Sequence, residues 1–275
     1  MCVWPQVMWK TVPVAVPESR VNPQFPALDY EYVLMEPVSA RPPPLVVYIH
    51  GGPHSCCVAE FQAHTAGLCV CGYAVLMVNY RGSVGFGQHS VDSLPGNIGR
   101  QDVDDVQAVA EQVAASGAVD ARRVVVMGGS HGGFLTLHCI AQCGRRFYRA
   151  AVARNPVVDV ASMLGATDIP DWAYVESGME FDARAVPTAE VYADMLKRSP
   201  LSGVDSIETP LLLLVGGQDR RVPASQGLQL GRALEARNLP LRVLWYPDCS
   251  HPLSDVRAEA DGFINVVKWF DEHII

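Results

Sequence analysis

The sequence lacks the features that mark several large classes of protein. No apolar run approaches the roughly 18 residues that a membrane-spanning helix needs, and the first ten residues, MCVWPQVMWK, lack the apolar core of a signal peptide. The eight cysteines form no C-x-x-C pair, and the eight histidines show no H-E-x-x-H spacing. We therefore expect a cytoplasmic protein with no metal site and no membrane partner, whose thiols are reduced and mostly buried.

Charge is also scarce, and positive charge is the scarcer sign. Charged residues make up 18% of the 275 residues, hydrophobic residues make up 49%, and the formal net charge is -8. No local run of lysine and arginine offsets the negative charge, so no nucleic-acid partner is expected. The composition argues against disorder and indicates a large packed interior.

What the sequence does contain is a series of short apolar runs that begins at residue 45. Before it, residues 1–44 form a proline-rich lead in which TVPVAV and DYEYVLM are expected as short antiparallel edge strands. Continuous runs of valine and leucine are typical of parallel strands that helices cover on both faces. The expected strands are residues 45–49, 74–79, 123–128, 150–155, 211–216 and 241–246.

Amphipathic patterns alternate with these runs, and they predict helices over residues 102–116, 133–143, 225–238 and 259–273. Alternating strands and helices predict one α/β domain over residues 45–275, with a mostly parallel sheet and helices on both faces. Residues 156–206 are longer than a typical connection. They are expected to form short helices that shape a substrate pocket over the carboxyl ends of the strands.

One expected strand ends in the stretch VMGGSHGG, which contains the pattern G-x-S-x-G around Ser130. This pattern forms a sharp turn between a strand and a helix and exposes a nucleophilic serine above the sheet. Here RVVVMG supplies the strand and HGGFLTLHCIAQ supplies the helix, so the context agrees with the motif. A glycine-rich turn that merely starts a helix is the alternative.

A serine hydroxyl needs a general base and an acid that orients the base, in the chain order Ser, Asp or Glu, His for this kind of turn. Asp219 follows the apolar run LLLLVG, and His251 follows the run LRVLWY, so both lie where strands end. Asp219 has an alternative interpretation as a helix cap. Asp248 is a competing acid, but it lies on the same loop as His251 and is poorly placed to support the ring from behind.

Acyl transfer also needs donors for the negative charge that develops on the carbonyl oxygen. The stretch HGGP, residues 50–53, directly follows a strand and has glycines that allow close approach of the backbone. We expect the backbone N–H groups of Gly52 and His131 to form this oxyanion hole. A plain glycine turn at HGGP is the alternative.

These motifs together resemble the prolyl oligopeptidase family of serine hydrolases. The resemblance rests on HGGPHS, NYRGSVGFG, GNIGRQDVDDV, MGGSHGGF, GQDRRVP and the strand-end histidine, and it extends over residues 25–272. RNPVVDVASMLG, DIPDW and DRRVP are most similar to the acylaminoacyl-peptidase branch of the family. The resemblance implies the α/β-hydrolase fold.

By this resemblance Ser130 is the nucleophile, Asp219 the orienting acid and His251 the general base, and Arg221 and Trp172 bind substrate. The implied activity is that of a serine peptidase which cleaves the N-terminal peptide bond of short N-acylated peptides. It releases an N-acylated, usually N-acetylated, amino acid through an acyl-enzyme and needs no cofactor. A general carboxylesterase of the same fold is the runner-up.

The sequence departs from the family in one respect, since members carry a β-propeller ahead of the hydrolase domain. Repeats of propeller-blade length are absent here. A catalytically impaired fragment, a shortened isoform and an incomplete gene model stay open as explanations. Without the propeller, apolar residues near the pocket, including Trp172 and Phe86, are expected to be exposed and to make the chain self-associate as a homo-oligomer.

Overall fold

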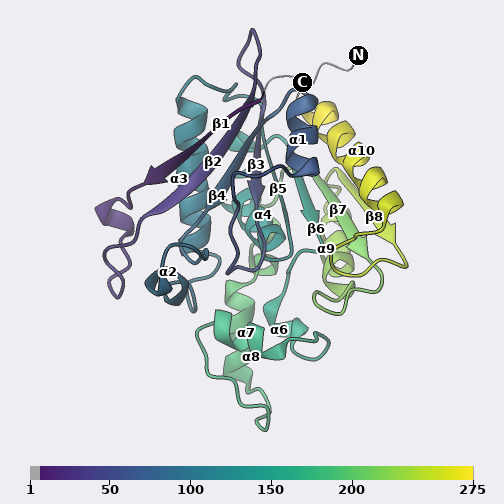
Figure 1. Ribbon diagram of the computed structural model, residues 1–275. Coiled ribbons are helices and arrows are strands. Elements are labelled where there is room, and N and C mark those ends of the chain that lie inside the picture. Colours follow the sequence, from purple (N-terminus) through teal and green to yellow (C-terminus); the bar gives the residue numbers. More distant parts are fainter. Residues whose placement is uncertain (1–6, 275) are drawn as a thin grey trace.

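Eight strands form one sheet whose spatial order differs from the order of the chain (Figure 1). In the computed structural model, which describes residues 7–274, the order is β1-β2-β4-β3-β5-β6-β7-β8. The strands are β1 Val7–Val14, β2 Tyr30–Pro37, β3 Leu45–Ile49, β4 Ala74–Asn79, β5 Val124–Gly129, β6 Ala151–Arg154, β7 Leu211–Gly216 and β8 Leu241–Tyr246. Every strand expected from an apolar run is confirmed to within two residues at its ends. Residues 1–6 and 275, and with them Cys2, lie outside the described residues.

The two N-terminal strands join the sheet through antiparallel pairs, as the sequence predicted, but only β1 lies at an edge, because β2 lies between β1 and β4. β1 pairs antiparallel with β2, and β2 pairs antiparallel with β4. From β4 to β8 all neighbouring strands are parallel. The carboxyl ends of these six parallel strands therefore meet at one edge of the sheet, where the loops that follow them come together.

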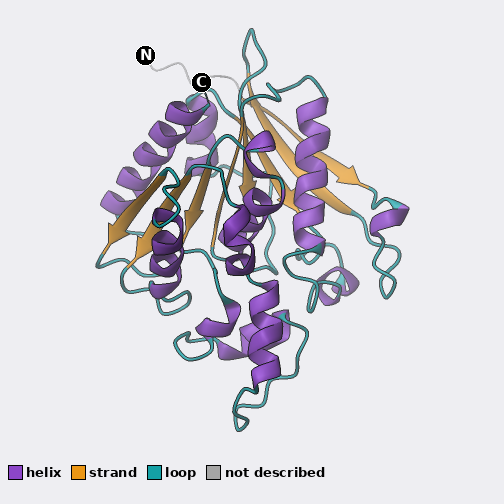
Figure 2. Ribbon diagram, turned by 180° about the vertical axis from the view of Figure 1, so that it is seen from behind, coloured by secondary structure: helices purple, strands orange, loops and turns teal. Residues whose placement is uncertain are grey.

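Helices cover both faces of the sheet, as Figure 2 shows from behind. Successive residues of a strand point to opposite faces, so Leu45, Val47 and Ile49 of β3 belong to one buried cluster and Val46 to another. The first cluster packs against α3, α4 and α9, and the second against α1 and α10. The helices are α1 Ala63–Val70, α2 Gln88–Asp92, α3 Gln101–Ala115, α4 His131–Gln142, α5 Gly144–Phe147, α6 Val160–Met163, α7 Pro170–Glu176, α8 Ala189–Arg198, α9 Ser225–Glu235 and α10 Val256–His273.

The four expected helices are present, and α1 is a helix that the apolar periodicity did not predict. The sequence of α1, AHTAGLCV, contains Gly67 in its middle, which weakens a helix prediction. A Cβ at Gly67 would lie 2.7 Å from the Phe263 ring of α10, so the glycine allows close packing between α1 and α10. Tertiary contact here outweighs local propensity.

Residues 156–206 form the short helices that the sequence predicted. They comprise α6, α7, α8 and the 3-10 helix Pro200–Ser206, which lie beyond the carboxyl ends of the strands (Figure 1). Trp172 and Met163 from this segment pack on the main apolar cluster. The segment is thereby anchored to the sheet edge where the strand-end loops meet.

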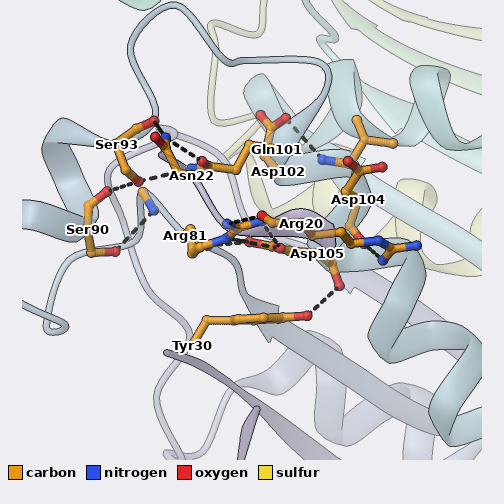
Figure 3. Close-up of polar contacts among 12 residues, drawn as sticks. Arg20, Asn22, Tyr30, Arg81, Ser90, Ser93, Gln101, Asp102, Asp104 and Asp105 are labelled. Carbon is orange, nitrogen blue, oxygen red and sulfur yellow. Dashed lines mark hydrogen bonds and ion pairs between the residues drawn. The ribbon is translucent and has the colours of Figure 1, made fainter. Parts of the chain in front are cut away.

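A buried ion pair fastens the N-terminal segment to the sheet and to α3 (Figure 3). The Arg81 guanidinium donates to both carboxylate oxygens of Asp105 at 2.7–3.2 Å, and both side chains are 2% exposed. Arg81 also donates to the Arg20 carbonyl, and Asn22 donates to Gln101. Burial raises the pKa of Asp105 to about 6, although Arg81 opposes that shift. Residues 20–22 are held by these bonds rather than by a strand.

The cysteines are less buried than the sequence suggested. All seven described cysteines are free thiols. Of these, Cys57, Cys69 and Cys139 are buried, Cys71 is exposed, and the other three are partly buried. Within residues 7–274, no group of three or more histidine, cysteine, aspartate or glutamate side chains could hold a metal ion. No described helix is both long enough and apolar enough to span a bilayer.

Candidate active site

Ser130 lies at the sharp turn between β5 and α4, where the pattern G-x-S-x-G predicted it. Its backbone is left-handed, with φ 58° and ψ -123°, a conformation that non-glycine residues rarely adopt. The flanking glycines allow the turn to be this tight. A Cβ at Gly128 would lie 2.3 Å from the Gly132 carbonyl oxygen, and one at Gly132 would lie 2.2 Å from the Ile49 carbonyl oxygen. The turn therefore presses the start of α4 against β3 and β5.

Asp219 and His251 meet through a short contact between the loops after β7 and β8. The distance between His251 Nδ1 and Asp219 Oδ2 is 2.6 Å. The side chain of Asp219 is fully buried and that of His251 is 25% exposed. The other oxygen, Asp219 Oδ1, accepts the backbone N–H groups of Arg221 and Val222 at 2.9 Å each. Both carboxylate oxygens are thus engaged, and the imidazole is held by its Nδ1 edge.

A cavity of about 290 Å³ brings together five of the seven residues that the sequence singled out. Ser130, His251, Gly52, Arg221 and Trp172 all line it, together with Val157, Met163, Ile169 and Val222. Asp219 lies behind His251, and His131 follows Ser130 as the first residue of α4. The 156–206 segment supplies an apolar part of the walls through Val157, Met163, Ile169 and Trp172.

The backbone N–H groups of Gly52 and His131 are available at this cavity. Among residues 7–274, no backbone or side-chain acceptor takes the Gly52 N–H, and Gly52 has φ 123°. The His131 N–H belongs to the first turn of α4, where N–H groups have no partner one turn earlier. The His131 ring points away, since it is fully buried and its Nε2 lies 2.9 Å from Asp102 Oδ2. His131 is not itself a lining residue of the cavity, so its backbone N–H as the second oxyanion donor stays a prediction.

The helix α7 holds the HGGP loop in place with two side chains. The Trp172 indole N–H donates to the Gly52 carbonyl at 3.0 Å, and the His54 Nε2 lies 3.1 Å from Glu176 Oε1. The Glu176 carboxylate raises the pKa of His54, so the contact strengthens when the ring is protonated. The insertion thus supports the loop that carries Gly52.

His50 stabilises the same loop from the protein interior. Its Nε2 lies 2.9 Å from Ser83 Oγ, and its ring stacks on Tyr80 with 4.4 Å between the centroids. The Tyr80 hydroxyl donates to the carbonyls of His50 and Pro53. Burial lowers the pKa of His50 to about 4, which keeps the ring neutral near pH 7. His50 thus supports the loop through its hydrogen bond to Ser83 and its stacking on Tyr80.

Arg221 lines the cavity and pairs with an acid that the sequence analysis did not identify. Its guanidinium lies 2.9 Å from Asp168, and both side chains are about half exposed, at 47% and 43%. The hydrogen bond from Arg221 holds the pKa of Asp168 below its usual range. Thr167 Oγ also donates to the Arg221 carbonyl at 2.7 Å. The cation at the cavity is therefore oriented by the end of the α6–α7 connection.

Asn155 and Arg154 are two further residues that the sequence analysis missed. The Asn155 amide donates to the His251 carbonyl at 2.8 Å and accepts the Gly216 N–H at 2.8 Å. The Arg154 guanidinium donates to the carbonyl of Pro252. Arg154 is the last residue of β6 and Asn155 directly follows it, and β6 is the neighbour of β5, which leads to Ser130. Both residues stand at the end of a predicted strand, in the stretch RNPV, and that position could have indicated that they lie near the site.

The expected exposure of Trp172 and Phe86 is wrong. Both side chains are partly buried; Trp172 packs on the main apolar cluster and donates its only N–H to Gly52. Large exposed apolar side chains include Phe61 and Val256, and also Val175 and Val186 within the segment 156–206.

The strand order, the helices on both faces and the serine at the strand-to-helix turn define an α/β-hydrolase. The family model "Prolyl oligopeptidase family" matches residues 59–275, and the chain belongs to this family. The acylamino-acid-releasing enzyme of Homo sapiens is 49% identical over 98% of this chain, and that of Arabidopsis thaliana is 42% identical over 84%. The match covers only 37% of the human protein and 30% of the Arabidopsis thaliana protein, so this chain spans about a third of their length.

A solved structure shows the same fold. A Pyrococcus horikoshii acylaminoacyl peptidase superimposes with a TM-score of 0.84 at 19% identity, over 97% of this chain and 42% of that chain. The chain therefore corresponds to the hydrolase portion of much longer proteins.

Proposed function

We propose that the protein is a serine peptidase that removes an N-acylated amino acid from the end of a short peptide. The contact of 2.6 Å between His251 Nδ1 and Asp219, in loops that meet at the cavity holding Ser130, carries this proposal. A carboxylate that accepts the Nδ1 proton leaves the opposite nitrogen, Nε2, free to act as a base. The cavity supplies the nucleophile, the base and two backbone donors.

The first half of the reaction forms an acyl-enzyme. Ser130 Oγ attacks the carbonyl carbon of the acylated residue, and His251 Nε2 takes the hydroxyl proton. The N–H groups of Gly52 and His131 stabilise the oxyanion, and Asp219 stabilises the imidazolium. His251 then gives its proton to the nitrogen of the leaving peptide, and the C–N bond breaks. Trp172 acts as a positioning residue because its indole holds the Gly52 peptide.

The second half uses water as the nucleophile. His251 removes a proton from a water molecule, which attacks the ester carbonyl on Ser130. The tetrahedral intermediate collapses, and the proton returns to Ser130 Oγ. The product is a free N-acylated amino acid, and no redox step or cofactor is needed.

The substrate class is supported by the relatives and by the cavity. Human and plant relatives bear the name acylamino-acid-releasing enzyme. The cavity of about 290 Å³ is small, apolar and bounded by the Arg221 cation, which suits a short acylated residue whose carbonyl oxygen needs a donor. Cytoplasmic placement is supported by the free thiols of the described residues, and assembly into a homo-oligomer remains a prediction.

A fluorophosphonate tests the chemistry, and a pair of substrates tests the specificity. The probe is expected to label Ser130 alone, and Ser130→Ala is expected to abolish both labelling and turnover. Adducts on Ser83, Ser90 or Ser250 would refute the assigned nucleophile. Turnover of an acetyl-alanyl amide is expected to exceed that of a short-chain ester per unit of labelled enzyme. The reverse order would favour a general carboxylesterase, and an unlabelled folded protein would indicate an impaired fragment.

A further inference from the structure

A second and larger cavity lies on the other face of the sheet, between α1 and α10. Its volume is about 630 Å³, within the range of small-molecule sites, and it shares no lining residue with the cavity of Ser130. The helices α1 and α10 lie side by side in Figure 1, on the face opposite α3. The reaction described above makes no use of this cavity.

The walls of this cavity are mostly apolar. Met127, Val152, Leu214, Leu253 and Val266 line it and belong to the buried cluster of that face. Gly67 and Gly262 also line it, and at Gly67 the Phe263 ring of α10 packs directly over the backbone. A cavity with such walls favours an apolar body of a ligand over water.

Three polar groups with spare hydrogen-bonding capacity occur together in these apolar walls. His64 Nε2 is buried and has no partner within the described residues. No hydrogen bond among residues 7–274 engages the Tyr48 hydroxyl, whose ring lies 6.2 Å from that of His64. The Arg154 guanidinium makes a single hydrogen bond, through Nη1, and pairs with no described carboxylate.

Tyr48, His64 and Arg154 all line this one cavity, and burial sets the charge state of the first two. Burial lowers the pKa of His64 to about 4, and Arg154 contributes in the same direction. Burial raises the pKa of Tyr48, and Arg154 opposes that shift. His64 is therefore a neutral donor or acceptor, Tyr48 is an uncharged donor, and Arg154 is the cation.

Arg154 also connects this cavity to the residues beside the proposed nucleophile and base. Its guanidinium lies flat on Gly129, where a Cβ would come within 2.7 Å of Nη2. Its Nη1 donates to Pro252, the residue after His251. Gly129 precedes Ser130, and both Gly129 and Pro252 line the cavity. A ligand on Arg154 would touch the chain on either side of the reacting groups.

We propose that this cavity binds an amphiphilic carboxylate, with the carboxylate on Arg154, Tyr48 and His64 and the apolar body between α1 and α10. A carboxylate suits the three groups because a guanidinium and two neutral donors match its two oxygens. Glu259 is the single carboxylate among the described lining residues, and it is exposed to solvent. A free fatty acid and an N-acylated amino acid with an apolar side chain share this chemistry.

Calorimetric titration of the Ser130→Ala protein tests the site without any contribution from turnover. Decanoate and N-acetylleucine represent the two sources of the carboxylate, and decanol lacks the charge. We expect one carboxylate per chain, and decanol to bind at least tenfold more weakly than decanoate. Whichever of decanoate and N-acetylleucine binds more tightly indicates whether the site takes a fatty acid or an N-acylated amino acid. Decanol binding as tightly as decanoate, or no binding of either carboxylate, would overturn the proposal.

Variants on α10 and at the polar groups locate the ligand. Ala260→Phe fills the cavity from an exposed position on α10, and Ile264→Phe adds a ring to the same helix outside the cavity lining. The first is expected to weaken decanoate binding at least tenfold and the second to leave it unchanged. Tyr48→Phe combined with His64→Leu is expected to weaken decanoate about tenfold and decanol hardly at all. Equal losses in Ala260→Phe and Ile264→Phe would place binding elsewhere.

A second readout tests the connection through Arg154. In the wild-type protein, decanoate is expected to change the rate of fluorophosphonate labelling at least threefold, and Ala260→Phe is expected to remove that effect. The labelling rate without decanoate is the reference. If the proposed peptidase activity is wrong, labelling is absent even without decanoate, so that failure is seen separately. An unchanged rate at saturating decanoate would refute the connection to Ser130.

Discussion

At the scale of residues, Asp219 uses each of its carboxylate oxygens for a different purpose. Oδ1 accepts two backbone N–H groups of its own turn, and Oδ2 accepts from His251. In Asp219→Asn the amide oxygen can keep the turn, while the NH₂ group faces His251 Nδ1 and imposes the wrong tautomer. Turnover is expected to fall by about 10⁴-fold with the melting temperature nearly unchanged.

The matched control is Asp248→Asn, which alters the competing carboxylate near His251. Its turnover is expected to stay within a factor of two of the wild type. Steady-state kinetics with an acetyl-alanyl amide and a thermal melt of each variant measure both quantities. A large loss in Asp248→Asn with little loss in Asp219→Asn would reassign the acid.

Single residues were predictable from the sequence where a strand end fixed their place. Ser130, Asp219 and His251 each follow an apolar run, and parallel strands bring such positions to one edge. The contacts of Trp172 with Gly52, and of Asn155 with His251, join segments that are far apart in the chain. Neither contact follows from spacing or composition, because each depends on how the insertion and the loops pack.

At the scale of elements, the Arg81 and Asp105 pair holds the N-terminal segment against α3. Arg81→Met removes the cation and leaves a buried carboxylate without its partner. The free energy of unfolding is expected to fall by about 3–5 kcal/mol. The double variant Arg81→Met with Asp105→Leu is expected to lose less free energy of unfolding than Arg81→Met alone, because no charge is then left buried without a partner. Urea denaturation of the three proteins measures the difference.

An exposed ion pair supplies the control for this experiment. Arg184 pairs with Asp182, and its side chain is 92% exposed. Arg184→Met is expected to change the free energy of unfolding by less than about 0.5 kcal/mol. A double variant that is less stable than Arg81→Met would show that the pair contributes specific packing beyond charge compensation.

Elements were predictable to the extent that their pattern is local. The valine and leucine runs gave the parallel strands, and the periodic helices α3, α4, α9 and α10 were found. The apolar periodicity did not indicate α1, because its helix depends on Phe263 packing over Gly67. The order of the strands in the sheet could not be predicted either, because local sequence patterns do not determine which strands pair.

At the scale of the whole molecule, three buried or partly buried histidines make the free energy of unfolding depend on pH. Burial lowers the pKa of His50, His64 and His138 to about 4 each. The unfolded chain, with histidine pKa values near 6.5, binds more protons than the folded one between pH 6.5 and pH 4. Stability is therefore present above this window and is lost as the pH falls through it.

The size of the effect follows from the number of these groups. The loss between pH 7 and pH 5 is at most about 5 kcal/mol for three histidines. Asp105, whose pKa is raised to about 6, binds its proton more readily in the folded state and offsets about 1 kcal/mol. Urea denaturation at pH 7, 6 and 5 measures the trend. A free energy of unfolding that is constant or rises toward pH 5 would contradict it.

The position of the three reacting groups along the chain also governs when the site comes into existence during synthesis. Ser130 and Asp219 follow β5 and β7, and His251 follows β8, the outermost parallel strand. Chains are made from the N-terminus, so a ribosome that has reached the end of β7 has produced the serine and its acid without a base. Under the proposed mechanism, the site therefore lacks its base until the residues that follow β8 have been made.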